Sequence, residues 1–181
     1  MTNRIAKPLK TIDIRNVAHF TRKKLLETSD DKSINMVKAL DALTFKFSRY
    51  GFNYVVLPDD DSIFQKWEEA KTDITTGTIY FKESIIEQAA HKRYCRANFT
   101  IAHEIGHFIL HRVLNLMNFS RTTSPAQPRV FEDPEWQADT FASELLMPYE
   151  QCQSLTSKEI RRKYHVTMSA AQTRYNKIHK N

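Results

Sequence analysis

Glycine is scarce in this sequence, with only three residues in 181. So few glycines exclude a long glycine-rich loop of the kind that cradles phosphate groups. There is also no run of about 18 consecutive apolar residues, and residues 1–20 contain no uninterrupted apolar stretch, so neither a membrane-spanning helix nor a secretion signal is indicated. We therefore expect a cytoplasmic protein with no membrane partner.

Cysteine is also scarce, because the chain has only Cys95 and Cys152. The two lie far apart in the sequence and form no CxxC pair, which argues against a disulfide framework and against a zinc cluster of thiolates. Buried or idle thiols are the simpler interpretation.

The charge balance favours Lys and Arg, and the formal net charge is +6. This excess would favour nucleic acid or another acidic partner, but it says little about the fold. With 41% hydrophobic and 27% charged residues, the composition is that of an ordinary globular protein, and the length suits one domain with its own core.

Hydrophobic periodicity and turn residues predict an α+β fold. Strands are expected at "FNYVVLP" (52–58) and "TTGTIYFKES" (75–84), and "SIFQKWEEAK" (62–71) reads as a short helix or a loop. The segment 120–129 has the composition of a loop. Helices are expected over 11–27, 34–50, 85–94, 97–116 and 134–147, with two short ones after 157.

The helix expected over 97–116 contains the motif HExxH, within "FTIAHEIGHFILH" (99–111). His103 and His107 are one helical turn apart, about 6 Å along the axis, so both can present a ring nitrogen to one metal ion. Glu104 lies about 100° further round the helix, where it can reach a water molecule held by that ion and act as general base. Two nitrogen ligands and an open position indicate Zn²⁺ and the hydrolysis of an amide.

His111 extends the spacing of the motif by four more residues. On a straight helix it lies about 12 Å from His103 along the axis, which is too far for two ligands of the same ion. We therefore expect His111 to have a structural or supporting role.

A third ligand has to come from another segment, and "FEDPEWQADTFASELLMP" (131–148) offers acidic residues. Glu135 and Asp139 are four apart on the expected helix, so one can bind zinc while the other holds a ligand histidine by its free ring N–H. An exposed acidic helix face is the alternative interpretation of this pair. Glu132 and Glu144 are further candidates for the third ligand.

The order of "RANFTIAHEIGHFILH" and "EWQADTFASELLMP" resembles the ImmA/IrrE family of zinc metallopeptidases. The resemblance covers most of residues 78–148. It implies a zincin-like fold in which His103, His107 and Glu135 bind zinc and Glu104 is the catalytic base. Asp139 stands where thermolysin-like gluzincins keep an aspartate that supports a ligand histidine.

The resemblance also implies a function. Family members are typically intracellular regulators encoded near phage, mobile-element or stress-response genes, and they cleave a helix-turn-helix repressor or an antitoxin-like partner. For this chain it therefore implies an endopeptidase that makes a limited cut in a regulatory protein, rather than a broadly digesting protease.

We expect residues 1–156 to form the zincin-like metallopeptidase domain, with a small mixed or antiparallel sheet, an HExxH helix and a second ligand helix. Residues 157–181 are expected to form a basic helical tail packed on the same domain. The tail could contact nucleic acid, although a solvated basic face is the simpler interpretation. Its basic residues are Lys158, Arg161, Arg162, Lys163, Arg174, Lys177 and Lys180.

Three further residues are candidates for a part in the chemistry or its regulation. Tyr80 and Tyr149 could each stabilise an oxyanion. Cys95 precedes His103 by eight residues, and its thiolate could occupy the open position on zinc and inhibit the enzyme. The segment "TGTIYF" (76–81) is the candidate for an edge strand that pairs with a peptide substrate.

The alternative function is a zinc-stabilised module that sequesters a regulator or DNA without hydrolysis. A purely structural zinc site normally has four protein ligands and does not need a glutamate beside the first histidine. The complete HExxH motif therefore favours the enzyme. The two hypotheses differ in the variant Glu104→Gln, which should abolish cleavage but should leave simple binding intact.

Overall fold

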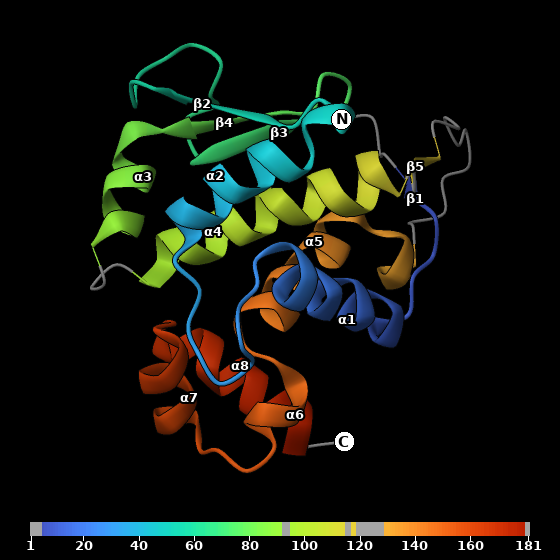
Figure 1. Cartoon of the computed structure of the whole chain (residues 1–181), viewed down its shortest axis with the longest axis vertical. Helices are drawn as coiled ribbons and strands as arrows, with labels where there is room; N and C mark the ends of the chain where they lie inside the picture. The colour runs from blue at the N-terminus through green and yellow to red at the C-terminus, as the bar shows by residue number, and fades with distance from the viewer. Residues whose placement is uncertain (1–4, 92–94, 115–116, 119–128, 180–181) are drawn as a thin grey trace.

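The computed structural model of the chain describes residues 5–91, 95–114, 117–118 and 129–179. The described part has an α+β architecture, as the sequence predicted (Figure 1). The helices are α1 (Thr11–Phe20), α2 (Met36–Lys46), α3 (Glu83–Ala90), α4 (Cys95–His107), α5 (Pro134–Leu146), α6 (Tyr149–Cys152), α7 (Ser157–Tyr164) and α8 (Met168–His179). The strands are β1 (Ile5–Ala6), β2 (Asn53–Leu57), β3 (Ala70–Asp73), β4 (Thr78–Lys82) and β5 (Met117–Asn118).

Four short helical turns complete the list of elements. Two are π-helical, η1 (Thr21–Leu25) after α1 and η3 (Phe108–Val113) after α4. Two are 3₁₀-helical, η2 (Ser48–Tyr50) and η4 (Val130–Glu132). The sequence had predicted one uninterrupted helix over 97–116, whereas the structure changes its helical pitch directly after His107.

The main sheet is mixed and has the strand order β2-β4-β3. Strand β2 runs parallel to β4, and β3 runs antiparallel to it. Gly77 has a φ of +85° in the turn between β3 and β4, a conformation that glycine adopts without steric cost. Strands β1 and β5 form a separate antiparallel pair.

Helix α4 runs through the middle of the molecule, with the sheet on one side and α1 and α5 on the other (Figure 1). Its buried side chains Ile101, Ala102 and Ile105 belong to the central apolar cluster. Phe81 of β4 and Phe141 of α5 belong to the same cluster. The HExxH helix is therefore held rigidly between the two layers.

One strand prediction is wrong. Residues 76–81 were expected to form the edge strand, but β4 lies in the centre of the sheet. Ile79 and Phe81 are fully buried, which is what a central strand requires. The edge strand beside α4 is β3 (Ala70–Asp73). It begins inside residues 62–71, which were expected to form a short helix or a loop.

The tail forms two helices, α7 and α8, around a turn in which His165 has a left-handed backbone conformation. Ile160, Tyr164 and Ala171 are buried and belong to the same apolar cluster as the rest of the chain. Arg174 does not belong to an exposed basic face, because it is buried and paired with Glu144. Lys180 and most of the loop expected over 120–129 lie outside the described residues.

None of the helices in the described ranges is both long enough and apolar enough to span a membrane.

Candidate metal centre

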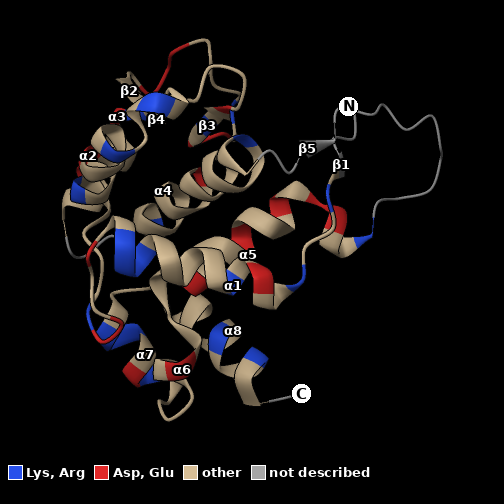
Figure 2. Cartoon of the chain, turned by 45° about the vertical axis from the view of Figure 1, so that its right-hand side comes forward, with Lys and Arg blue, Asp and Glu red and all other residues tan. Residues whose placement is uncertain are grey.

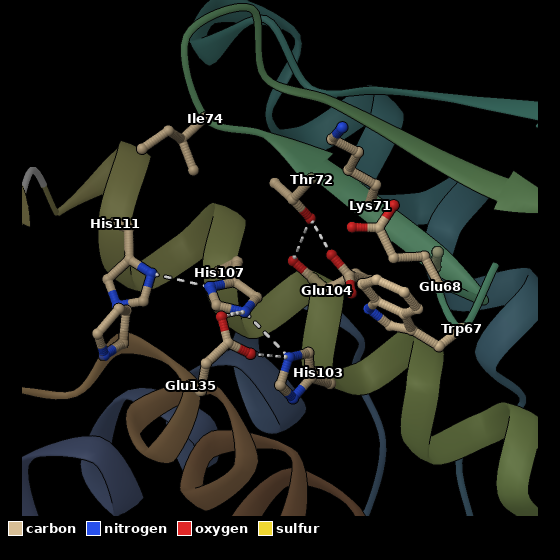
Figure 3. Close-up of a pocket in the computed structure, with 12 residues that line it drawn as sticks. Trp67, Glu68, Lys71, Thr72, Ile74, His103, Glu104, His107, His111 and Glu135 are labelled. Carbon is tan, nitrogen blue, oxygen red and sulfur yellow. Dashed lines mark hydrogen bonds and ion pairs between the residues drawn. The ribbon is translucent and has the colours of Figure 1, made fainter. Parts of the chain in front are cut away.

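Three side chains from two helices converge at the open side of α4 (Figure 3). The Nε2 atoms of His103 and His107 lie 2.9 Å apart. Glu135 Oε2 lies 3.3 Å from His103 Nε2, and Glu135 Oε1 lies 3.5 Å from His107 Nε2. One donor atom from each of these side chains lies within 4.8 Å of the others, so together they form a candidate metal-binding group.

The start of helix α5 places Glu135 at this group. Asp133 caps the helix by accepting a 3.0 Å hydrogen bond from the Glu135 backbone N–H, and Pro134 occupies the first helical turn. Glu135 is therefore in the first turn of α5, beside the face of α4 that carries both histidines. Its side chain is 68% exposed and so remains accessible to a bound ion.

Gly106 allows α4 and α5 to approach closely. A Cβ atom at this position would lie 3.0 Å from Phe141 Cδ1 and 3.2 Å from Ala138 Cα. Both distances are shorter than ordinary carbon–carbon contacts. The absence of a side chain at Gly106 thus lets α5 pack against α4 at Ala138 and Phe141, the next turns of the helix whose first turn carries Glu135.

His103 is oriented through its second ring nitrogen. Its Nδ1 lies 2.8 Å from Oδ1 of Asp139, which follows Glu135 by one helical turn on α5. Burial opposes a charge on the ring, but hydrogen bonds with Asp139 and Glu135 outweigh it and raise the pKa of His103 to about 10. Hydrogen bonds with His103, and in second place with His107, hold the pKa of the Glu135 carboxyl well below its usual range.

His107 is oriented through a chain of buried groups. Its Nδ1 lies 3.1 Å from His111 Nδ1, and His111 Nε2 lies 3.1 Å from Gln137 Oε1. Gln137 Nε2 donates 2.8 Å hydrogen bonds to the carbonyl oxygens of Lys7 and Phe131. Burial lowers the pKa of His111 to about 4, so this ring is neutral near pH 7.

Glu104 points away from this group and toward strand β3. Its carboxylate Oε2 accepts a 2.6 Å hydrogen bond from Thr72 Oγ1, which also lies 3.2 Å from the Glu104 carbonyl oxygen. The residue is only 8% exposed. Thr72 therefore fixes the carboxylate at the wall of the cleft (Figure 3).

The cleft beside these residues has a volume of about 430 Å³. Strand β3 forms one wall, through Ala70, Lys71 and Thr72, and the HExxH helix forms the opposite one. Trp67 stands at the cleft with 75% of its surface exposed. Strand β3, the Glu104 carboxylate and the candidate metal-binding group therefore line the same cleft.

Several residues singled out from the sequence lie elsewhere. Neither Tyr80, Tyr149 nor Cys95 is among the residues that line the cleft. Tyr149 instead stacks under the guanidinium of Arg15, 3.6 Å from its ring centre. The structure therefore does not bring these three side chains to the metal-binding group.

The two other acidic candidates for a third ligand are engaged in different contacts. Glu144 is buried and its carboxylate pairs with Arg15 and Arg174. Glu132 accepts a hydrogen bond from the backbone of Arg129. Only Glu135 of the acidic residues on and before α5 has its carboxylate against both histidines of the motif, within the described part of the chain.

Two residues of the site were missed in the sequence. Thr72 lies in "AKTD", which has no alternating apolar pattern to mark it as a strand. Gln137 is a fully buried polar residue two positions after Glu135, and a single sequence does not show which helical polar residues are buried. His111 was noticed, but its partner could not be identified without the fold.

Comparison with known proteins supports the same assignment of fold. A family model described as IrrE N-terminal-like domain, Peptidase_M78, matches residues 64–176. Among solved structures, a Mycobacterium tuberculosis transcriptional regulator is similar, with 14% sequence identity and a TM-score of 0.55. This similarity covers 91% of this chain and 46% of that chain.

The low identity to the regulator makes this a likeness of fold, and the present chain spans less than half of the regulator's length. No curated protein sequence matches the chain.

Proposed function

Because the chain belongs to the Peptidase_M78 family of IrrE N-terminal-like domains, and so contains a metallopeptidase-like domain, we propose that it is a zinc-dependent endopeptidase. Its proposed substrate is a regulatory protein, which it cuts at a limited number of sites. The observation that carries the proposal is the triangle of donor atoms from His103, His107 and Glu135.

The size and chemistry of this triangle suit zinc. Zinc bonds to nitrogen and oxygen at about 2 Å, which places neighbouring ligands of a tetrahedral ion roughly 3.3 Å apart. The two Nε2 atoms lie 2.9 Å apart, and each lies 3.3 or 3.5 Å from a different oxygen of the Glu135 carboxylate, which are distances close to this value. Three protein ligands also leave a fourth position open, as in catalytic rather than structural zinc sites.

When bound, zinc would polarise the carbonyl of a peptide bond and lower the pKa of a water molecule. Glu104 would accept the proton of the attacking water at its carboxylate and return it to the nitrogen of the departing amine. Thr72 would keep Glu104 Oε2 in place, because its hydroxyl is within 2.6 Å. Asp139 would hold the His103 ring in the orientation that turns Nε2 toward the ion.

The edge strand β3 is the proposed binding site for the peptide. An unpaired strand edge offers backbone donors and acceptors to an extended chain, and β3 lines the cleft beside Glu104. This replaces β4, which was expected to take that role. A substrate paired with β3 would pass between Trp67 at one end and Ile74 at the other.

A helix-turn-helix repressor or an antitoxin-like protein is the proposed partner. The family resemblance supports this class of substrate, and one solved structure of similar fold is a transcriptional regulator. Nucleic acid bound to such a substrate could contact the exposed Lys158, Arg161 and Arg162 of α7. Figure 2 marks Lys and Arg positions along the ribbon of α7 in blue.

The proposal is tested by intact-mass analysis of a helix-turn-helix regulator encoded beside the gene and co-expressed with the chain. Wild type should yield two fragments of the regulator, whereas Glu104→Gln should yield none and should still bind zinc. Glu68→Gln is the matched control, because it removes another carboxylate from the cleft without touching Glu104.

Fragments that persist with Glu104→Gln would contradict the role of Glu104. A regulator that stays intact with wild type, but is retained on both wild type and Glu104→Gln, would instead identify a module that sequesters its partner.

A further inference from the structure

The third histidine of the motif region has no role in the proposed hydrolysis, yet it is almost completely buried at 3% exposure. His111 lies on the π-helical turn η3, next to His107 and among the residues that line the cleft (Figure 3). It contacts His107 on one side and Gln137 on the other, and Gln137 has no exposed surface. Gln137 is therefore shielded from water, whereas the His107 side chain is 13% exposed and lines the cleft.

The direction of the hydrogen bonds in this chain is fixed at its far end. Gln137 Nε2 lies 2.8 Å from two backbone carbonyl oxygens, those of Lys7 and Phe131. Carbonyl oxygens only accept hydrogen bonds, so the NH₂ group of the amide must face them. The opposite orientation would place Oε1 against two other oxygens and Nε2 against His111, and both hydrogen bonds from Gln137 to the carbonyls would be lost.

The protons of the two rings follow from this orientation. Gln137 Oε1 accepts a hydrogen bond, so His111 Nε2 must carry the hydrogen. A neutral imidazole has one N–H, so His111 Nδ1 is an acceptor and His107 Nδ1 must donate to it. His107 Nε2 then has a free lone pair, and this is the atom that faces His103 and Glu135.

We propose that His111 and Gln137 form a relay that holds His107 in the tautomer and orientation required for metal binding, with the Lys7 and Phe131 carbonyls setting its direction. This inference rests on the proposed zinc site and assigns positioning residues to it. In this chain the HExxH motif would thus extend to HExxHxxxH, in which the last histidine is His111. Its partner is Gln137, two residues after Glu135.

The two metal-binding histidines are thus held in different ways. His103 Nδ1 meets the carboxylate of Asp139, whose side chain is 60% exposed. Water can partly replace that contact if Asp139 is lost. His111 is only 3% exposed, so its loss leaves His107 Nδ1 and Gln137 Oε1 without the partner that the fold provides.

The first test is a long-range ¹H–¹⁵N correlation of the histidine rings in the metal-free, full-length wild type. We expect the hydrogen on Nδ1 of His107 and on Nε2 of His111. The reverse tautomers, or rapid exchange between the two forms, would overturn the relay. This measurement needs no substitution and is independent of zinc binding.

The second test compares two substitutions of His111 by zinc titration against a chromophoric chelator. His111→Phe fills the space but offers no acceptor, and we expect zinc affinity to fall by about 10- to 100-fold, as for other groups that support a metal ligand. His111→Asn keeps an acceptor near the place of Nδ1 and should recover most of the affinity. Equal affinities for both variants and wild type would overturn the relay.

The tests also separate the relay from the proposed function. A wild type that binds no zinc would contradict the metal site, whatever the tautomers are. The expected tautomers in such a protein would support the relay as a feature of the fold. If His111→Phe does not fold, the affinity of His111→Asn and the spectrum of the wild type still decide the question.

Discussion

The Thr72 hydroxyl contacts the Glu104 carboxylate at 2.6 Å and helps to position it. It donates a hydrogen bond to a carboxylate oxygen of this almost buried residue. Hydrogen bonds to charged groups contribute about 1.5–3 kcal/mol, so a tenfold or larger effect on rate is expected when one is lost.

We therefore predict that Thr72→Val lowers the rate of substrate cleavage roughly 10-fold and leaves zinc affinity unchanged. Thr72→Ser keeps the hydroxyl and is the matched control, with activity near that of wild type. Single-turnover cleavage and zinc titration of the three proteins measure the two effects separately. A Thr72→Val enzyme as active as wild type would exclude the positioning role.

The two cysteines differ in environment, and this predicts their reactivity. Burial raises the pKa of the Cys152 thiol to about 11, and its side chain is fully buried. Cys95 is partly exposed. With a thiol reagent at pH 8, we predict that Cys152→Ser still reacts rapidly through Cys95, and that Cys95→Ser reacts only after unfolding.

The raised pKa of Cys152 also predicts a dependence of stability on pH. The folded state disfavours the thiolate, so the contribution to stability is complete below the ordinary thiol pKa of 9.0 and is lost as the pH rises toward about 11. Equilibrium unfolding of wild type and Cys152→Ser between pH 8 and 11 checks the sign. A wild type that loses no more stability than the variant over this range would contradict it.

The predictability of the site varied with the kind of residue. His103, Glu104 and His107 share one helix, where spacing alone fixes their relative positions. Glu135 required the family resemblance, because its approach to the histidines depends on the packing of two helices. Thr72 and Gln137 could not be predicted, since their roles depend on which strand reaches the cleft and which helix face is buried.

At the scale of elements, the contact between α4 and α5 assembles the metal-binding group. Gly106 sets the distance between them, and any side chain there meets Phe141 and the backbone of Ala138. Inserting extra carbon atoms into a packed interior costs typically 1–3 kcal/mol.

We predict a graded loss of zinc affinity in the order wild type, Gly106→Ala, Gly106→Val, because each added group moves Glu135 further from the histidines. Chelator competition gives the affinities, and circular dichroism shows whether the fold is kept. A Gly106→Val protein that binds zinc as tightly as wild type would show that the helix contact does not control the site.

The sheet shows why an edge strand is hard to identify in a sequence. Strand β4 has buried Ile79 and Phe81, which gave a clear β pattern. Strand β3 buries only Ala70 and presents its other side chains to the cleft or to solvent. The edge strand therefore has the weaker sequence pattern, because only one of its four side chains is buried.

At the scale of the whole molecule, one buried ion pair joins the C-terminal helices to the rest of the chain. Arg174 of α8 donates hydrogen bonds of 2.8 and 2.6 Å to both carboxylate oxygens of Glu144 on α5. Arg15 of α1 contacts the same carboxylate at 3.1 Å. Both Glu144 and Arg174 are almost fully buried.

Removing one partner of a buried pair leaves the other charge without compensation and costs about 3–5 kcal/mol. For Glu144→Gln we predict a fall in the unfolding temperature of roughly 10 °C, in a single transition for the whole chain. Glu150→Gln, at an exposed position of α6, should leave the unfolding temperature unchanged. Two separate transitions would show that the tail folds as a unit of its own.

The central claim is that His103, His107 and Glu135 hold one zinc ion beside Glu104. Anomalous diffraction at the zinc absorption edge, from crystals of the full chain grown with one equivalent of zinc, tests it most directly. The account predicts one peak about 2 Å from both Nε2 atoms and from the Glu135 carboxylate. A peak at another cluster of side chains, or no peak between these three residues, would contradict it.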